Sequence, residues 1–265
     1  MLSNQPDVNA LTRLRSILLG LGTLILVLGG WQWGSQQYSR VILPAPIEVA
    51  VVLRSLLLER RLWAAIAATS LHVLVGFILA LVIGGLLGLA AGRQSWVRPA
   101  LTPVAIALLG TPPIAWLMLT MVWFGLGHAN SIFTVAITVG PMVFAGVVNA
   151  VMTLDPNLVD VAQVYQLSGT SRFQSLYWPH LVSRLLPLLV TGLGLAWRVS
   201  IMSEVLATPT GIGAELNTAR ANLDTAEVMA WIVITIGLVL ASDTLLRRLQ
   251  QQLLPWQQPA KPLGW

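Results

Sequence analysis

Apolar residues in this chain run in long unbroken stretches, separated by shorter polar segments. Six stretches are near or above the roughly twenty residues that an α-helix needs to cross about 30 Å of hydrocarbon. They cover residues 16–33, 64–91, 100–125, 131–152, 182–206 and 228–246. A membrane β-barrel would require polar and apolar residues to alternate along each strand, and these stretches are continuous. The pattern predicts an all-α integral membrane protein with six transmembrane helices, and we expect residues 1–265 to form a single transmembrane domain.

Composition agrees with this fold class and excludes several kinds of chemistry. Only 9% of the residues are charged and 56% are hydrophobic, with a mean hydropathy of +0.77. Soluble domains carry about a quarter charged residues, so a water-soluble fold is excluded. The chain has no cysteine, and His72, His128 and His180 lie in different segments without the spacing of metal ligands. We therefore expect no metal site and no cofactor.

The sequence also argues against an enzyme. Lys261 is the only lysine and precedes a proline, so the GxxxxGK[ST] phosphate-binding loop is impossible. No Ser-His-Asp grouping or carboxylate pair is present at a spacing that suggests catalysis. Any process driven by ATP must be powered by another polypeptide. The net charge of +5 forms no patch that suggests a nucleic-acid partner.

The distribution of arginines predicts that the amino terminus lies in the cytosol. This orientation places Arg93, Arg98, Arg172, Arg247 and Arg248 on the cytosolic side, as the positive-inside rule prefers. It conflicts with Arg54, Arg60 and Arg61, which fall outside, although segment 46–62 suits an amphipathic helix along the interface. The first stretch follows Arg13 and Arg15, as a signal peptide does, but it is too long and lacks a cleavage pattern. We expect it to remain as an anchor.

A long polar interruption at residues 153–180 is the most informative segment for function. Connections between packed helices are usually far shorter. Asp155 can cap a short helix that begins at Pro156. Its residues on one face are Leu158, Val161, Ala162 and Tyr165. Gly169 would end this helix, and Thr170 or Ser171 could cap a second one that stops before Pro179. By length and pattern alone, the first helix suits either a bilayer surface or a partner protein.

The same segment resembles the EAA loop of binding-protein-dependent ABC importer permeases. The pattern of that family is E-A-A, three residues, Gly, nine residues, then I-x-L-P. Asp160 takes the place of the acid, Ala162 of the second alanine and Pro179 of the proline. The sequence departs from the pattern at three positions, which are Val161, Gln166 (where glycine is usual) and Trp178.

Three further segments resemble the same family, in the same order along the chain. Leu43–Pro46 resembles its external LPSP-like segment, and Trp123–Gly127 resembles the WFGxG at the end of its third span. Glu204 followed by Gly211–Gly213 resembles its E…GLG element. The family usually has a proline before the WFG segment. This chain has Met118 near that position, although Pro112–Pro113 offers a break nearby.

The resemblance implies a transport function with specific partners. The loop 153–180 would be a cytosolic coupling loop that docks on an ABC ATP-binding subunit. Its docking residues would be Asp160, Ala162, Gln166, Gly169 and Pro179. An extracytoplasmic solute-binding protein would deliver the solute, and the chain would work as a homodimer in a bacterial inner membrane. The subgroup most similar carries nitrate, sulfonates, taurine or bicarbonate, so a small oxyanion is the expected substrate. A heterocyclic vitamin precursor is the alternative within the family.

Two charged residues of the fifth stretch are candidates for the translocation path or gate. A buried charge in a membrane span is costly unless it is paired or hydrated, so Arg198 is a functional candidate, or else a structural tie to a neighbouring span. Glu204 lies six residues further, about 9 Å along the helix axis, which makes direct pairing poor. Because Glu204 matches a family position at the outer end, we expect it to belong to the outer gate.

Other features have simpler interpretations. We expect His72 to bond a neighbouring helix, glycines 84, 88 and 92 to permit close helix packing, and Asp243 and Arg247 to form an i, i+4 pair. Tryptophans at span ends suit interfacial anchoring. A secondary transporter driven by an ion gradient would need paired broken helices, and only Pro112–Pro113 marks a break. A bare membrane anchor would leave Arg198 and the capped loop unexplained.

Overall fold

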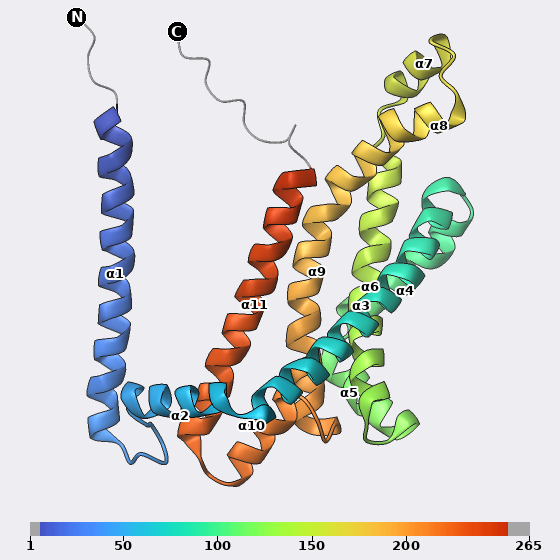
Figure 1. Ribbon diagram of the computed structural model, residues 1–265. Helices are drawn as coiled ribbons and strands as arrows, with labels where there is room; N and C mark the ends of the chain where they lie inside the picture. Colours follow the sequence, from blue (N-terminus) through green and yellow to red (C-terminus); the bar gives the residue numbers. More distant parts are fainter. Residues whose placement is uncertain (1–5, 254–265) are drawn as a thin grey trace, which may run out of the picture. The chain divides into compact units, whose positions relative to one another are not determined.

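The computed structural model describes residues 6–253, and these form helices without any β-strand (Figure 1). The first three helices are α1 (Pro6–Gln37), α2 (Pro46–Leu58) and α3 (Arg60–Arg93). They are followed by α4 (Val97–Gly110), α5 (Pro113–Phe124), α6 (His128–Met152), α7 (Pro156–Val164), α8 (Gly169–Arg172) and the π-helical turn η1 (Phe173–Tyr177). The last are α9 (Trp178–Ala207), α10 (Ile212–Ala221) and α11 (Thr225–Leu253).

Five of these helices are long and apolar enough to cross a membrane, and the number is six if α4 and α5 together count as one span. This confirms the all-α membrane fold. The span predicted over 100–125 is broken at Pro112–Pro113, the break that the sequence indicated, and α4 and α5 meet there at an angle of 96°. Thr111 is extended, and Pro112 and Pro113 follow it. A proline lacks the N–H that would continue the helical ladder, so the pair ends one helix and starts the next.

The chain divides into two compact units, and the smaller one contains residues 6–59 and 218–233 of the described chain. Here α2 covers only the first part of the predicted interfacial segment 46–62 and ends at Leu58. Glu48 fixes its start, since its carboxylate accepts the Ala45 N–H at 3.0 Å and pairs with Arg40 at 3.1 Å. Trp31 of α1 donates its indole N–H to the Pro44 carbonyl at 2.9 Å. The Leu43–Pro46 segment is therefore tied to α1.

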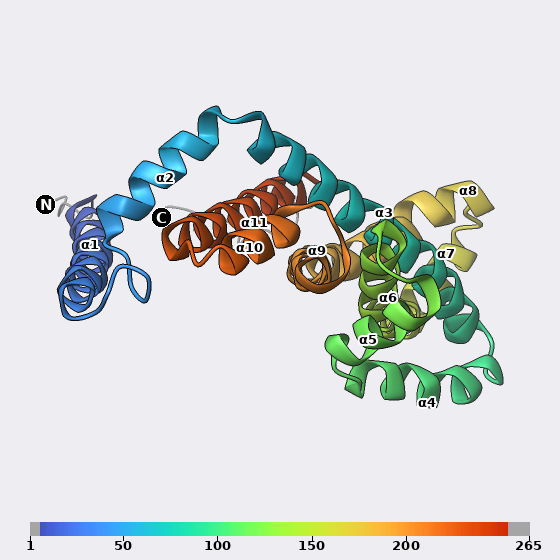
Figure 2. The same cartoon turned by 90° about the horizontal axis from the view of Figure 1, so that it is seen from below.

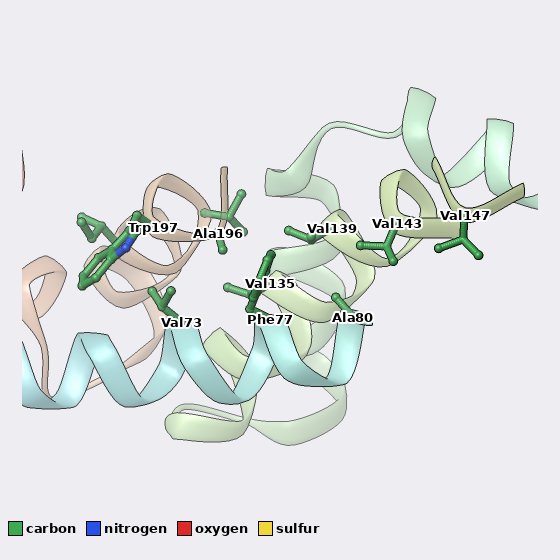
Figure 3. Close-up of a cluster of buried hydrophobic side chains, with 11 residues drawn as sticks. Val73, Phe77, Ala80, Val135, Val139, Val143, Val147, Ala196 and Trp197 are labelled. Atoms are coloured by element: carbon green, nitrogen blue, oxygen red, sulfur yellow. The ribbon is translucent and has the colours of Figure 1, made fainter. Parts of the chain in front are cut away.

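The larger unit contains residues 60–217 and 234–253 of the described chain, and its core is built by α3, α6 and α9. Figure 2 shows α6 and α9 nearly end-on beside α3. Apolar side chains of the three helices meet along their length, as Figure 3 shows for Val73, Phe77, Val139 and Trp197. These helices form the frame on which the charged residues of α9 are placed.

Close contact between α3 and α6 depends on the predicted glycines. A Cβ added at Gly84 would overlap the carbonyl oxygen of Gly140, and one added at Gly88 or Gly92 would overlap valine side chains of α6. Gly85, on another side of α3, has open space around it. The packing role predicted for positions 84, 88 and 92 is confirmed.

The loop after α6 differs in detail from the sequence expectation. Asp155 caps α7 as predicted, accepting the Asn157 N–H at 2.9 Å. However, α7 ends before Gly169, and Ser168, rather than Thr170 or Ser171, caps the next helix by accepting the Ser171 N–H. The expected stop before Pro179 is also wrong. Pro179 lies in the first turn of α9, where its missing N–H costs nothing, so η1 leads directly into the long helix.

Candidate translocation and coupling sites

Glu204, near the end of α9, is completely buried and surrounded by hydrogen-bond donors. Its Oε2 accepts the Thr69 hydroxyl at 2.8 Å and the Gly213 N–H at 3.0 Å. Its Oε1 accepts the Ser200 hydroxyl at 3.2 Å and lies 2.8 Å from His72 Nδ1. Both oxygens of this carboxylate therefore act as acceptors, from Thr69 and Gly213 at Oε2 and from Ser200 at Oε1. Glu204 therefore joins α3, α9 and the start of α10.

A pair of histidines extends this network to the surface. Nε2 of the buried His72 lies 2.7 Å from Nδ1 of His128, which begins α6 and is exposed. If His72 donates from Nδ1 to Glu204, its Nε2 shares one proton with His128. The expected bond between His72 and a neighbouring helix is confirmed, and it has two partners. Sequence reasoning missed Thr69 and His128, although the polar pair Thr69 and His72, three residues apart in an apolar helix, was an available signal.

Two of the family-like segments meet at this place. The Gly127 N–H, at the end of the Trp123–Gly127 segment, donates to the Ala207 carbonyl at the end of α9, at 2.8 Å. Gly211 has φ +111°, and a Cβ there would overlap the carboxylate of Glu204. Gly125 also has positive φ, at 67°. Glycine adopts such conformations without a steric penalty, which explains its presence in both segments.

Arg198 occupies a different environment from Glu204. Its side chain is exposed, and within residues 6–253 it has no ion pair or hydrogen bond. Thr191 lies seven residues before Arg198 on the same face of α9, and Arg184 lies seven residues before Thr191. Both are exposed. Seven residues correspond to about 10 Å along a helix and return to nearly the same direction. The three side chains therefore form one polar row, which we call the α9 row.

Loop 153–180 presents an apolar surface on α7. Ala162 is only 4% exposed, whereas Val164 is 79% and Tyr165 is 75% exposed, and Leu158 and Val161 are exposed as well. These exposed residues, rather than the Ala162 side chain, are available to a partner. Figure 1 shows α7 and α8 at the end of α6 and α9 that lies away from α10.

Backbone geometry explains why glycine is usual at the position of Gln166. After α7, Gln166 has φ 50°, a left-handed conformation. The next N–H, of Leu167, donates back to the Ala162 carbonyl at 3.1 Å, and the Gln166 N–H donates to the Gln163 carbonyl at 2.9 Å. This pair of bonds is a Schellman motif, which usually has glycine at its left-handed residue.

The remaining candidates of the loop lie apart from one another. Asp160 and Gly169 are exposed, and Pro179 is half-buried at the start of α9. The side chain of Asp160 makes no hydrogen bond or ion pair with any residue that the structure describes. Across the described part of the chain, no three His, Asp or Glu side chains are grouped closely enough to hold a metal ion.

Comparison with known proteins identifies the family. The family model described as "Binding-protein-dependent transport system inner membrane component" matches residues 73–257. The chain belongs to this family. This permease is therefore a multi-pass protein of the bacterial inner membrane and the membrane subunit of an ABC importer, a class that works with ATP-binding and substrate-binding partners.

Individual relatives agree with this assignment. The permease is 28% identical to the taurine transport system permease protein TauC of Escherichia coli, over 91% of this chain and 90% of the relative. It is 31% identical to the riboflavin transport system permease protein RibX of Chloroflexus aurantiacus, over 95% of each. The inward-facing MetNI methionine ABC transporter has a similar fold, with a TM-score of 0.58 and 16% identity over 75% of this chain and 96% of that chain.

Proposed function

We propose that two copies of this permease, each a single transmembrane domain of residues 1–265, form the path for a small oxyanion such as nitrate, a sulfonate, taurine or bicarbonate. Two separate ATP-binding subunits would hydrolyse ATP, and an extracytoplasmic solute-binding protein would deliver the anion. The amino terminus and loop 153–180 would face the cytosol, so that α10 and the Glu204 network lie toward the outer side.

The observation that carries the substrate class is Arg198 in the fifth span, which is exposed and has no partner in the described part of the chain. A guanidinium group facing hydrocarbon without a partner would cost several kcal/mol. The cost is avoided if this side of α9 faces water in the assembled transporter. A second copy of the chain would enclose such a space and place two Arg198 side chains along it. Guanidinium groups match the geometry of oxyanions, so the path would favour anions.

The rest of the α9 row supports the same path for the anion. Thr191 and Arg184 continue the face of Arg198 toward the cytosolic end of the helix, at intervals of about 10 Å. A hydroxyl and a second guanidinium would each hold an anion weakly on its way inward. Similarity to a taurine permease is consistent with an anionic group on the solute.

We propose that α7 is the contact with the ATP-binding subunit. Its exposed Leu158, Val161, Val164 and Tyr165 would enter an apolar cleft, while the buried Ala162 keeps the helix close to the rest of the loop. Asp160 would pair with a basic group of the ATPase. Gln166, Gly169 and Pro179 would set the direction of the loop into α9, so that movement of the ATPase tilts this span.

Glu204 would serve the outer gate from inside the protein. Because it is buried and bonded to Thr69 and Gly213, it would hold the turn between α9 and α10 in place. It would not contact the solute itself. Movement of α9 during the cycle would then carry this turn with it.

A heterocyclic vitamin precursor is the second candidate substrate, and the similarity to a riboflavin permease favours it. The oxyanion and the vitamin precursor are distinguished by measuring uptake into proteoliposomes that contain the permease, its ATPase and its solute-binding protein. ATP-dependent uptake of taurine or nitrate that falls in Arg198→Gln would support the oxyanion. Uptake of riboflavin alone would overturn the oxyanion, and uptake without the ATPase would overturn the ABC assignment in favour of an ion gradient.

A further inference from the structure

A second polar site lies where the coupling loop joins the spans. A cavity of about 520 Å³ is enclosed by the ends of α3 and α6, by α8 with η1, and by the start of α9. Its polar lining side chains are Arg93, Arg172, Tyr177 and His180. No carboxylate lines it, although two guanidinium groups do.

Both arginines lack an acceptor. Within the part of the chain that the structure describes, the side chains of Arg93 and Arg172 make no ion pair and no hydrogen bond. The Nε of Arg172 is shut off from solvent and has no hydrogen-bond partner. A buried N–H of a charged group without an acceptor is costly, and a bound ion or water would remove that cost.

The neighbouring polar groups are compatible with an anion. Nε2 of His180 lies 2.9 Å from the Ala150 carbonyl and donates a hydrogen bond to it, which orients the ring. Tyr177 contributes a hydroxyl, which can donate to an oxyanion. Positive-inside bias accounts for arginines at this end of the spans. It does not account for a guanidinium nitrogen that is shut off from solvent and has no acceptor.

We propose that this cavity is a binding site for a phosphate-type oxyanion, held by the guanidinium groups of Arg172 and Arg93 and by the Tyr177 hydroxyl. Such a group can come from a free anion or from the headgroup of an anionic phospholipid, since most of the remaining lining residues are aliphatic. The bound anion would link α8 of the coupling loop to the end of α3. The site is separate from the α9 row and does not rest on the transport proposal.

The test measures binding to the full-length permease without ATPase. In one arm, permease in phosphatidylcholine nanodiscs is titrated with radiolabelled inorganic phosphate. In the other arm, phosphatidylglycerol is added to the nanodiscs, and the lipid retained after extraction is identified by native mass spectrometry. Saturable phosphate binding assigns a free anion, and retained phosphatidylglycerol assigns a lipid headgroup.

Substitutions decide whether the cavity is responsible. Arg172→Gln and Arg93→Gln should each weaken binding about tenfold or more, because a charge-assisted hydrogen bond is lost. Arg172→Lys keeps the charge but removes the Nε–H, and it should weaken binding as well. The matched control is Arg98→Gln, which removes one positive charge at the same end of the spans. Arg98 does not line the cavity, and its Nη1 lies 2.7 Å from Met152 Sδ.

Three results would overturn the site. These are no binding in either arm, unchanged binding in both Arg172→Gln and Arg93→Gln, or an equal loss in Arg98→Gln. Size-exclusion chromatography and thermal unfolding report whether each variant is folded. If Arg172→Gln does not fold, Arg93→Gln, at the exposed end of α3, is used instead. Weaker binding in Arg93→Gln would support the site, and unchanged binding would overturn it.

Discussion

Arg198 and Glu204 are six residues apart on α9, but Arg198 is exposed and has no partner among residues 6–253, whereas Glu204 is fully buried among hydrogen-bond donors. Six residues turn a helix by about two-thirds of a circle beyond a full turn, so the two side chains leave it in different directions. One helix thus carries a charge available to a solute and a charge used inside the protein. Substitutions at the two positions should have different consequences.

Arg198→Gln should lower ATP-dependent anion uptake by about tenfold or more and leave the assembled complex intact, because the lost charge contacts only the path. Uptake into proteoliposomes and the yield of purified complex measure the two effects. Arg198→Lys should recover part of the uptake. Arg248→Gln, an exposed residue near the end of α11, is the control. Loss of the folded complex in Arg198→Gln would indicate a structural role.

Glu204→Gln should destabilise the protein by about 3–5 kcal/mol, since it removes one partner of a buried charged network and turns an amide NH₂ toward donors. Thermal unfolding of the permease in detergent measures the change. Glu59→Gln removes an exposed carboxylate and should leave unfolding unaltered. Equal melting temperatures for Glu204→Gln and the unsubstituted protein would contradict the network.

Val164→Glu should prevent co-purification with the ATP-binding subunit while the permease still inserts and folds. Val164 is 79% exposed, so a charge there costs little in the free permease but would be buried in the proposed apolar contact. Affinity co-purification from membranes measures the association. Asn157→Glu, also exposed on α7, tests whether any added charge has this effect. Normal co-purification of Val164→Glu would exclude this face of α7.

Ala162→Asp should act differently, through the structure of the loop. Ala162 is 4% exposed, so an aspartate would be buried without a partner. We expect both transport and ATPase association to be lost, together with increased protease sensitivity of loop 153–180. Loss of association without any increase in cleavage would indicate that Ala162 contacts the ATPase directly.

Gln166→Gly should stabilise the coupling loop by about 1 kcal/mol, and Gln166→Val should destabilise it by more. The residue has φ 50°, which costs an L-residue with a Cβ about 1–2 kcal/mol and a β-branched residue still more. Hydrogen exchange of residues 156–167 measures local stability. Slower exchange in Gln166→Val than in Gln166→Gly would be inconsistent with the Schellman motif.

Much of this permease follows from its sequence because the causes are local. The length of each apolar stretch predicts a span, since a helix satisfies its own backbone in hydrocarbon. Asp155 predicts the start of α7 from its own side chain, and Asp243 predicts its bond to Arg247, observed at 2.7 Å, from a spacing of four residues. The bend after Gly110 was only partly predictable. Proline pairs mark a break, but the angle depends on how α5 packs on α6.

Only the tertiary structure decided the relationships between residues that are distant in the chain. Thr69, His72, His128 and Glu204 belong to three helices, and nothing local indicates that they converge. The cavity with Arg93 and Arg172 likewise exists only once α3 and α8 are brought together. The sequence determined the spans, the Asp155 cap of α7 and the family, because each depends on neighbouring residues. The environment of each charge was decided by packing, because burial and hydrogen-bond partners come from whichever helix lies alongside.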